Sequence, residues 1–281
     1  MPDMRTVVVC TAQSMIKDNL SALAAAVAFY AFLSIFPALT AVVSFYGLVS
    51  DPVTVKNQVA AMTGVLPPEA TMLVAAWLQA LIQGPPARFG IGLVVSVVFA
   101  LWSAWSATGV LMTAVNICYG ETESRSFIRF NLEALILSSG LAAFGISAVA
   151  LVGAVPAALD LLPIPASWHH VIALVRWPLL TGLVFLALAI VYRYAPARAY
   201  AHWHFVSGGA VVATVLWIAG SLVFATYVSA VGSYDKIYGS LSAVIILLLW
   251  FYLTAYVILV GAELNSELER HARKPTHYLR P

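Results

Sequence analysis

The residues of this sequence that could do chemistry are few, and they lie within or beside long apolar runs. Glu263 and Asn265 directly follow the apolar stretch 257–260. A carboxylate in such a place lies either at the cytoplasmic interface or paired inside the helix bundle, and the second case would indicate function because a buried charge is costly. A proton-coupled process would need a buried carboxylate, and Glu263 and Glu133 are the two candidates near apolar runs.

Polar residues also follow one face of the first apolar run. Tyr30, Ser34, Pro37, Ala41 and Ser44 recur at steps of three or four residues, which places them on one side of a helix. Proline has no N–H to donate to the preceding turn, so a kink is predicted at Pro37. Such a face either packs on other helices or lines a polar path, and the sequence leaves both explanations open.

Charged and aromatic residues interrupt the apolar sequence at 232–239, where Asp235 stands beside Lys236. A surface turn with solvated charges explains this segment. The alternative is a short segment that returns into the mouth of the bundle, with Tyr234 and Tyr238 lining an opening.

Asn116 and Arg176 complete the set of candidate residues. Asn116 stands at the end of the second apolar run, and Arg176 lies inside the outer end of the fourth, where its guanidinium can reach anionic lipid headgroups. The candidate substrate path therefore comprises Tyr30, Ser34, Pro37, Ser44, Asn116, Arg176, Tyr234, Asp235, Lys236, Tyr238, Glu263 and Asn265.

Signatures of metal or cofactor chemistry are not found in the sequence. His202 and His204 have an alternate spacing that some metal sites use, but no carboxylate or cysteine is near them. Cys10 and Cys118 stand alone and are expected to be ordinary free thiols. The sequence has no glycine-rich phosphate loop, no nucleophile elbow and no zinc-protease helix. We therefore expect no catalytic residues, no metal, no cofactor and no enzymatic activity.

The elements that position these residues are membrane-spanning helices. Of the 281 residues, 62% are hydrophobic and only 9% are charged, too few charges to cover a water-soluble fold. Apolar runs long enough to span a bilayer occupy residues 22–49, 89–117, 132–159, 171–194, 205–231 and 239–264. The predicted fold is all-α, a single polytopic membrane domain over residues 1–281 with about six transmembrane helices.

The basic residues in the connections between the runs predict the membrane topology. Six crossings place both termini on one side, and ten of the fourteen basic residues flank that side, which the positive-inside rule identifies as cytoplasmic. These ten are Arg5, Lys17, Arg125, Arg129, Arg193, Arg198, Arg270, Arg273, Lys274 and Arg280. We expect a multi-pass protein of the bacterial cytoplasmic (inner) membrane with cytoplasmic N- and C-termini, and the first twenty residues lack the order of a cleaved signal peptide.

Two further segments and a stripe of small residues are recognisable. Residues 50–88 form the one long connection, predicted as an extracytoplasmic amphipathic helical hairpin, and residues 265–281 are predicted to form a basic cytoplasmic tail. Small residues recur at every fourth position, as in Ser139, Ala143 and Ser147. Packing within one chain is the simpler explanation of that spacing, and a homo-oligomer contact is the alternative.

Several segments together resemble one family of bacterial inner-membrane proteins. They are 29–37 (FYAFLSIFP), 101–103, 116–120, 125–127, 194–196, 207–209, 238–239, 249–252 (LWFY) and 261–265 (GAELN), in that order. The combination resembles the YihY/BrkB family and covers about residues 19–267. The resemblance implies a six-helix inner-membrane protein. Some family members carry the label ribonuclease BN, others a virulence label, and the family supplies no agreed catalytic residues.

The favoured hypothesis is a transporter or flippase-like protein for a lipid or another amphipathic envelope molecule, with membrane lipids as its partners. An accessory or scaffold protein that transports nothing is the alternative. A membrane ribonuclease is disfavoured, since Glu263 and Glu267 share a helical face but lack a second acidic cluster and histidines in register. A net charge of +2 likewise gives no basic face for nucleic acid.

Overall fold

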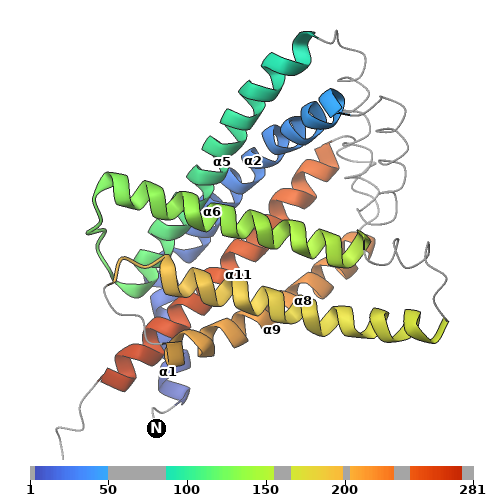
Figure 1. The fold of residues 1–281 in the computed structure, drawn as a ribbon. Helices are drawn as coiled ribbons and strands as arrows, with labels where there is room; N and C mark the ends of the chain where they lie inside the picture. Colours follow the sequence, from blue (N-terminus) through green and yellow to red (C-terminus); the bar gives the residue numbers. More distant parts are fainter. Residues whose placement is uncertain (1–3, 50–86, 155–165, 199–202, 231–240, 274–281) are drawn as a thin grey trace, which may run out of the picture.

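The structure, a computed structural model, describes residues 4–49, 87–154, 166–198, 203–230 and 241–273 (Figure 1). All elements in this part of the chain are helices. They are α1 (Met4–Lys17), α2 (Leu20–Val49), α5 (Ala87–Tyr119), α6 (Phe127–Val149), the short π-helix η1 (Ala150–Ala154), α8 (Ala166–Tyr194), α9 (Trp203–Ala230) and α11 (Ser242–Arg273). The predicted all-α fold is confirmed.

Six of these helices are long and apolar enough to cross a membrane, namely α2, α5, α6, α8, α9 and α11. They occupy the six predicted runs, so the polytopic architecture is also confirmed. The predicted outer hairpin falls outside the described residues, except for its last two, which begin α5.

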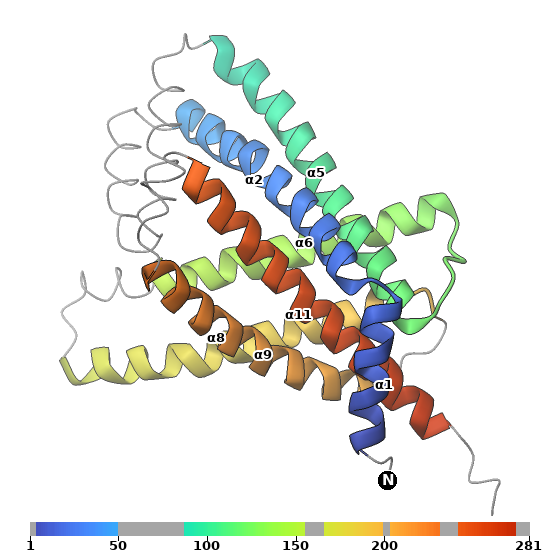
Figure 2. The ribbon, with the colours of Figure 1, turned by 180° about the vertical axis from the view of Figure 1, so that it is seen from behind.

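The spanning helices pack in a closed order. Each contacts two neighbours in the series α5, α2, α11, α9, α8, α6, and α6 returns to α5. In addition, α11 contacts α5. Both views show α2 side by side with α5, and α11 beside α2 (Figures 1 and 2). The last helix of the chain is therefore the one that most of the bundle packs around.

Buried side chains concentrate at one end of this bundle. The core residues lie in the first halves of α2, α6 and α9, in the last halves of α5 and α8, and in the middle of α11. Because successive helices reverse direction, these segments meet at the same end, hereafter the packed end. Toward the other end many large apolar side chains are exposed, including Val94, Val98, Leu174 and Leu222. Such surfaces suit contact with lipid chains, which carry no penalty for exposed apolar area.

The first helix is a feature that sequence analysis did not predict. In α1 the residues Val7 and Thr11 are buried and Cys10 is half-buried, so one face of the helix packs, and the element it packs against is α11. Asn19 ends the helix in the left-handed region at φ 50°, which asparagine tolerates better than most residues. The chain then turns directly into α2. The N-terminal segment thus caps the packed end.

At the opposite terminus, α11 is longer than its apolar run. The helix continues to Arg273, through residues expected to begin a basic tail, and Asn265, Ser266, Glu267 and Glu269 on this extension are buried. The extension is stabilised because its polar side chains have partners. Asn265 accepts a hydrogen bond from the N–H of Gly209 on α9, Glu269 pairs with Arg198 in the chain after α8, and Glu267 pairs with Arg270 on α11 itself. Within the described residues, the basic tail is therefore part of a packed helix.

The small-residue stripe of α6 does not pack within the chain. Ser139, Ala143 and Ser147 are all exposed, and each of the two serine hydroxyls donates to the carbonyl four residues earlier. The simpler explanation of this stripe, helix packing within one chain, is wrong for the described residues.

Two glycines on facing helices allow the closest helix approach at the packed end. A Cβ added at Gly209 of α9 would meet the carbonyl oxygen of Gly261 on α11, and one at Gly261 would meet the hydroxyl of Tyr192 on α8. The helices α8, α9 and α11 therefore converge at Gly209 and Gly261, where a hydrogen atom fits as the side chain but a methyl group does not.

We predict that Gly261→Ala destabilises the protein by about 1–3 kcal/mol, because a methyl group there must displace Tyr192 or separate the helices. Thermal unfolding in detergent, followed by circular dichroism, measures this loss. Gly182→Ala is the matched control, since nothing lies within 4 Å of its added Cβ. An unfolding midpoint for Gly261→Ala equal to that of Gly182→Ala would contradict the close packing.

Candidate functional site

The site includes a tight connection between α5 and α6. Gly120 adopts φ 66°, its N–H bonds the carbonyl of Ile117, and the N–H of Glu121 bonds the carbonyl of Asn116. This is the Schellman pattern, which ends a helix and reverses the chain. Ser126 then caps α6 by accepting a hydrogen bond from the N–H of Arg129. The acidic and basic residues between the two caps are held against the packed end.

Asn116 joins this connection to the chain that follows α8. Its side-chain amide donates to Glu123 at 2.9 Å, and its carbonyl oxygen accepts from the N–H of Ala197 at 2.6 Å. Donor and acceptor of the buried amide are thus both used, as burial requires. The predicted candidate Asn116 therefore positions two loops.

Arg125 is the most connected side chain of the site. Its guanidinium bonds both carboxylate oxygens of Glu123 at 2.7 and 2.8 Å, Glu133 at 2.7 Å and the carbonyl of Ala195 at 3.0 Å. Only 6% of this side chain is exposed. The hydrogen bonds from Arg125 lower the pKa of Glu123 below its usual value, so this carboxylate is charged at neutral pH. Arg125 thereby clamps α6 to the end of α8.

Arg198 makes a second clamp, between the end of α8 and α11. Its guanidinium bonds the Glu269 carboxylate at 2.6 Å and the carbonyl of Tyr192 at 3.1 Å, and it lies over the Tyr119 ring at 4.3 Å. The Tyr192 hydroxyl in turn donates to the carbonyl of Ile258. Aromatic faces attract a guanidinium, so the pair is held on three sides.

A pocket of about 730 Å³ opens between α6 and α8 beside these clamps. Four arginines and one glutamate line its polar part: Arg125, Arg129, Arg193, Arg198 and Glu133. Ile136, Leu137, Gly140 and Ile190 line the rest, deeper along the two helices, and Ser124, Tyr194, Pro196 and Ala197 complete the wall. The pocket is therefore basic at one end and apolar at the other.

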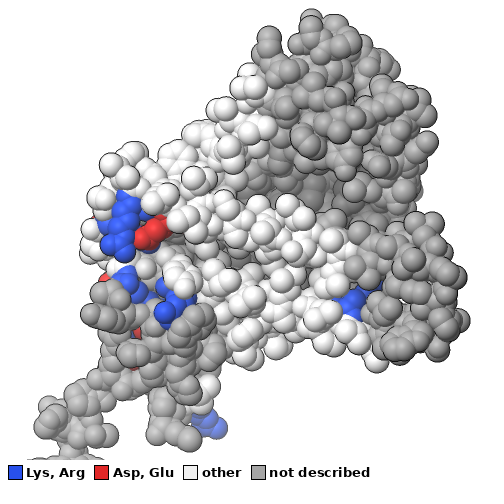
Figure 3. All heavy atoms as spheres, in the orientation of Figure 1, with Lys and Arg blue, Asp and Glu red and all other residues white. Residues whose placement is uncertain are grey.

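Helical spacing produces this division. On α6, Arg129, Glu133, Leu137 and Gly140 follow each other at three- and four-residue steps, so they form one face about 16 Å long. Arg129 is largely exposed and pairs with Glu133 at 2.8 Å. Figure 3 shows most of the charged side chains of this view gathered at one end of the molecule, with a wide uncharged face beyond.

Glu263 lies apart from the pocket, in the packed end itself. Its side chain is fully buried, and neither carboxylate oxygen accepts a hydrogen bond within the described residues. Asp18, Cys118 and Arg270 are its electrostatic neighbours. The sequence left open a carboxylate at the cytoplasmic interface or one paired inside the bundle; Glu263 is buried in the bundle, but its carboxylate is not paired by a hydrogen bond within the described residues. The role of Glu263 in proton coupling stays a prediction.

The other predicted candidates are dispersed. Asn265 accepts a hydrogen bond from the N–H of Gly209 at 2.6 Å, which ties α9 to α11. On α2, Pro37 is buried and the Ser34 hydroxyl donates to the carbonyl of Ala31 at 2.7 Å in its own helix. Tyr30 is half-buried and meets Phe29 edge to face.

The remaining candidates lie toward the end opposite the packed end or outside the described residues. Arg176 lies near the start of α8, over the Trp177 ring at 5.4 Å. Tyr234, Asp235, Lys236 and Tyr238 lie outside the described residues, as does the side chain of Ser44. The structure places Asn116, Glu263 and Asn265 at the packed end. Among the described residues, the proton-coupling candidate Glu133 lies in the wall of the pocket, and no member of the predicted substrate path does.

Sequence reasoning missed the pocket, although its four arginines were recognised. They were interpreted as a topology signal, and they stand in two pairs about seventy residues apart. The spacing from Arg129 to Gly140 could have indicated one face. Only the folded structure shows that this face of α6 packs beside α8.

Comparisons with known proteins agree with this architecture. A family model described as Virulence factor BrkB matches residues 11–279. The chain is 29% identical to a ribonuclease-like protein, YfkH, of Bacillus subtilis, over 89% of this chain and 90% of that protein. It is 28% identical to a UPF0761 membrane protein of Vibrio atlanticus, over 90% of this chain and 79% of the relative. No solved structure matches.

We predict that Arg198→Gln destabilises the protein by about 3–5 kcal/mol, because Glu269 is buried and loses a cation at 2.6 Å. Arg129→Gln is the control, with an expected cost below about 1 kcal/mol, since its side chain is 71% exposed. Thermal unfolding in detergent compares the two. Adding Glu269→Gln to Arg198→Gln should recover part of the loss, and equal midpoints for Arg198→Gln and Arg129→Gln would refute the clamp.

Proposed function

We propose that this chain, which belongs to the BrkB family of integral membrane proteins, is a transporter or flippase-like protein for an amphipathic envelope molecule with an anionic headgroup, most simply an anionic phospholipid. The observation that carries the proposal is the pocket between α6 and α8, which is basic at one end and apolar at the other.

The pocket suits the two halves of a lipid. Guanidinium groups bind phosphate oxygens through paired hydrogen bonds, which favours an anionic headgroup at the end lined by Arg129 and Arg193. The apolar lining of Ile136, Leu137 and Ile190 continues toward the membrane interior, where an acyl chain would lie. A small soluble anion would contact the basic end alone, whereas an amphipathic ligand would also contact the apolar wall.

Charge distribution supports the orientation. At the packed end the described residues include Arg125, Arg129, Arg193 and Arg198, and Arg270 lies near the end of α11. The opposite end has Arg88 and Arg176 among the described residues. By the positive-inside rule, we infer that the packed end faces the cytoplasm of a bacterial cell and that the pocket meets the cytoplasmic leaflet. Anionic lipids there would be attracted to it.

The acidic residues disfavour the ribonuclease alternative. Glu263 and Glu267 are 0% and 5% exposed, so neither carboxylate is accessible to RNA. Glu267 is moreover paired with Arg270 at 2.9 Å. The ribonuclease-like name belongs to the Bacillus subtilis relative, and we propose no enzymatic activity for this chain.

We predict that the protein purified in mild detergent retains an anionic phospholipid and that Arg129→Gln with Arg193→Gln weakens its binding about thirtyfold. The estimate follows from about 1 kcal/mol for each basic residue near an anionic headgroup. Native mass spectrometry with added phosphatidylglycerol measures the bound lipid. Arg176→Gln, at the other end of α8, is the control.

Three outcomes would count against this proposal in different ways. Unchanged lipid retention in the double arginine variant would exclude the pocket. Loss of lipid in Tyr30→Phe with Ser34→Ala, but not in the arginine variant, would move the path to the polar face of α2. Retained lipid that is never moved between leaflets would favour the alternative of an accessory protein.

A further inference from the structure

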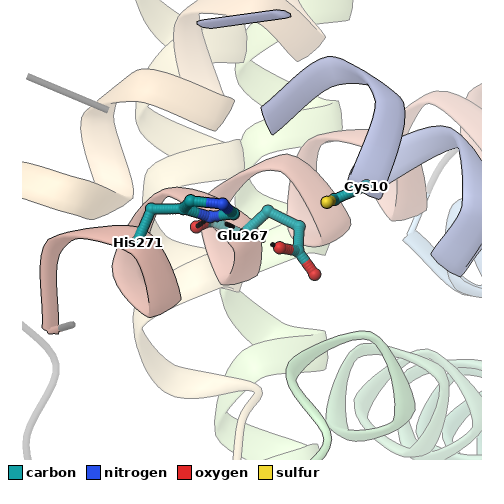
Figure 4. A group of neighbouring side chains, drawn as sticks. All are labelled: Cys10, Glu267 and His271. Carbon is teal, nitrogen blue, oxygen red and sulfur yellow. Dashed lines mark hydrogen bonds and ion pairs between the residues drawn. The ribbon is translucent and has the colours of Figure 1, made fainter. Parts of the chain in front are cut away.

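A cluster of metal-ligating side chains lies away from the pocket, where α1 packs against α11. The Cys10 sulfur, a Glu267 carboxylate oxygen and a His271 ring nitrogen all lie within 4.8 Å of one another. Figure 4 shows the three side chains pointing toward one another, Cys10 from α1 and the other two from α11. Glu267 and His271 are four residues apart, so they share one helical face.

We propose that Cys10, Glu267 and His271 form a zinc site that links the N-terminal helix to the end of α11. Thiolate, imidazole and carboxylate are the three donor types that Zn²⁺ takes in proteins. Thiolate with imidazole disfavours magnesium and calcium, which prefer oxygen ligands alone. Three protein ligands leave a fourth tetrahedral position for water or another ligand.

The distances are near those of a bound ion. Zinc–ligand bonds of about 2.0–2.3 Å place tetrahedral ligand atoms roughly 3.3–3.8 Å apart. Because the three atoms lie within 4.8 Å of one another, they need to close by at most about 1.5 Å to reach that range. Cys10 and His271 are both half-buried at the edge of the packed end, so rotation about their side-chain torsions can supply this movement.

Neighbouring groups already orient the ligands. The Nδ1 of His271 lies 2.9 Å from the backbone carbonyl of Glu267, and a carbonyl can only accept, so Nδ1 carries the proton. The lone pair is then on Nε2, which is the nitrogen left for a metal. Arg270 bonds Oε1 of Glu267 at 2.9 Å, while Oε2 lies 3.6 Å from Nδ1 of His271. One carboxylate oxygen is thus held by Arg270, and the other lies beside the histidine ring.

Binding would exchange a proton for the metal. The Cys10 thiol loses its proton to solvent as the sulfur–zinc bond forms, so affinity should rise with pH. The link would join α1 to the helix around which the bundle packs. Because α1 holds no spanning sequence and contacts the bundle through one face, a metal cross-link there would decide whether the N-terminal helix stays docked.

The test is a zinc titration of the full chain, purified in detergent without a histidine tag, stripped with chelator and kept reduced. We expect about one equivalent of Zn²⁺ per chain against a chromophoric competitor, with affinity falling more than about tenfold in Cys10→Ser and in His271→Gln. Co²⁺ in place of Zn²⁺ should show tetrahedral visible bands and a thiolate charge-transfer band.

Matched variants separate this site from other thiols and histidines. Cys118→Ser removes the other cysteine, which is buried elsewhere, and should leave binding unchanged. The pair His202→Gln and His204→Gln should also leave it unchanged. The proposal is overturned if wild type binds no stoichiometric zinc, if Cys10→Ser binds as wild type does, or if the cobalt spectrum lacks the thiolate band.

Discussion

The arrangement of the helices depends on buried, hydrogen-bonded ion pairs at the packed end. Arg125 joins the loop after α5 and the face of α6 to the chain beyond α8, and Arg198 joins that chain to α11. Lipid offers no partner for such groups, so each must be satisfied within the protein or pay a large desolvation penalty. Because apolar helices gain little from meeting one another in lipid, these polar clamps and the close glycine contacts select which helices are neighbours.

The same arginines create the pocket. Arg125 is paired with Glu123 and Glu133 and ties α6 to the chain after α8, whereas Arg198 is paired with Glu269 and ties that chain to α11. Arg129 and Arg193 then line the opening between helices that are already held apart. A structural clamp and the proposed lipid-binding surface therefore share one set of residues. Variants for functional work are accordingly taken from Arg129, which is largely exposed, and from Arg193, which is half-buried, because loss of the buried Arg125 or Arg198 weakens the fold.

Hydropathy and charge predict the spans, because bilayer thickness dictates the length of an apolar helix, whereas the family resemblance rests on specific segments such as 29–37 and 261–265. The sequence could not reveal contacts between elements. Arg125 meets the carbonyl of Ala195 across seventy residues, and Cys10 meets Glu267 across nearly the whole chain. Helical periodicity tells which residues share a face, as for Glu267 and His271, but not which helix that face meets. The short helix α1 was missed because its apolar residues are too few to span a membrane, although Val7, Cys10 and Thr11 have helical spacing.

Movement of an anionic lipid through the α6–α8 pocket is the central claim, and leaflet exchange in reconstituted vesicles tests it most directly. Fluorescent phosphatidylglycerol in vesicles containing the wild-type protein should become accessible to an external quencher from both leaflets. Arg129→Gln with Arg193→Gln should slow that exchange about tenfold or more, whereas Arg176→Gln should not. Exchange no faster than in protein-free vesicles, or equal rates for wild type and the double variant, would contradict the account.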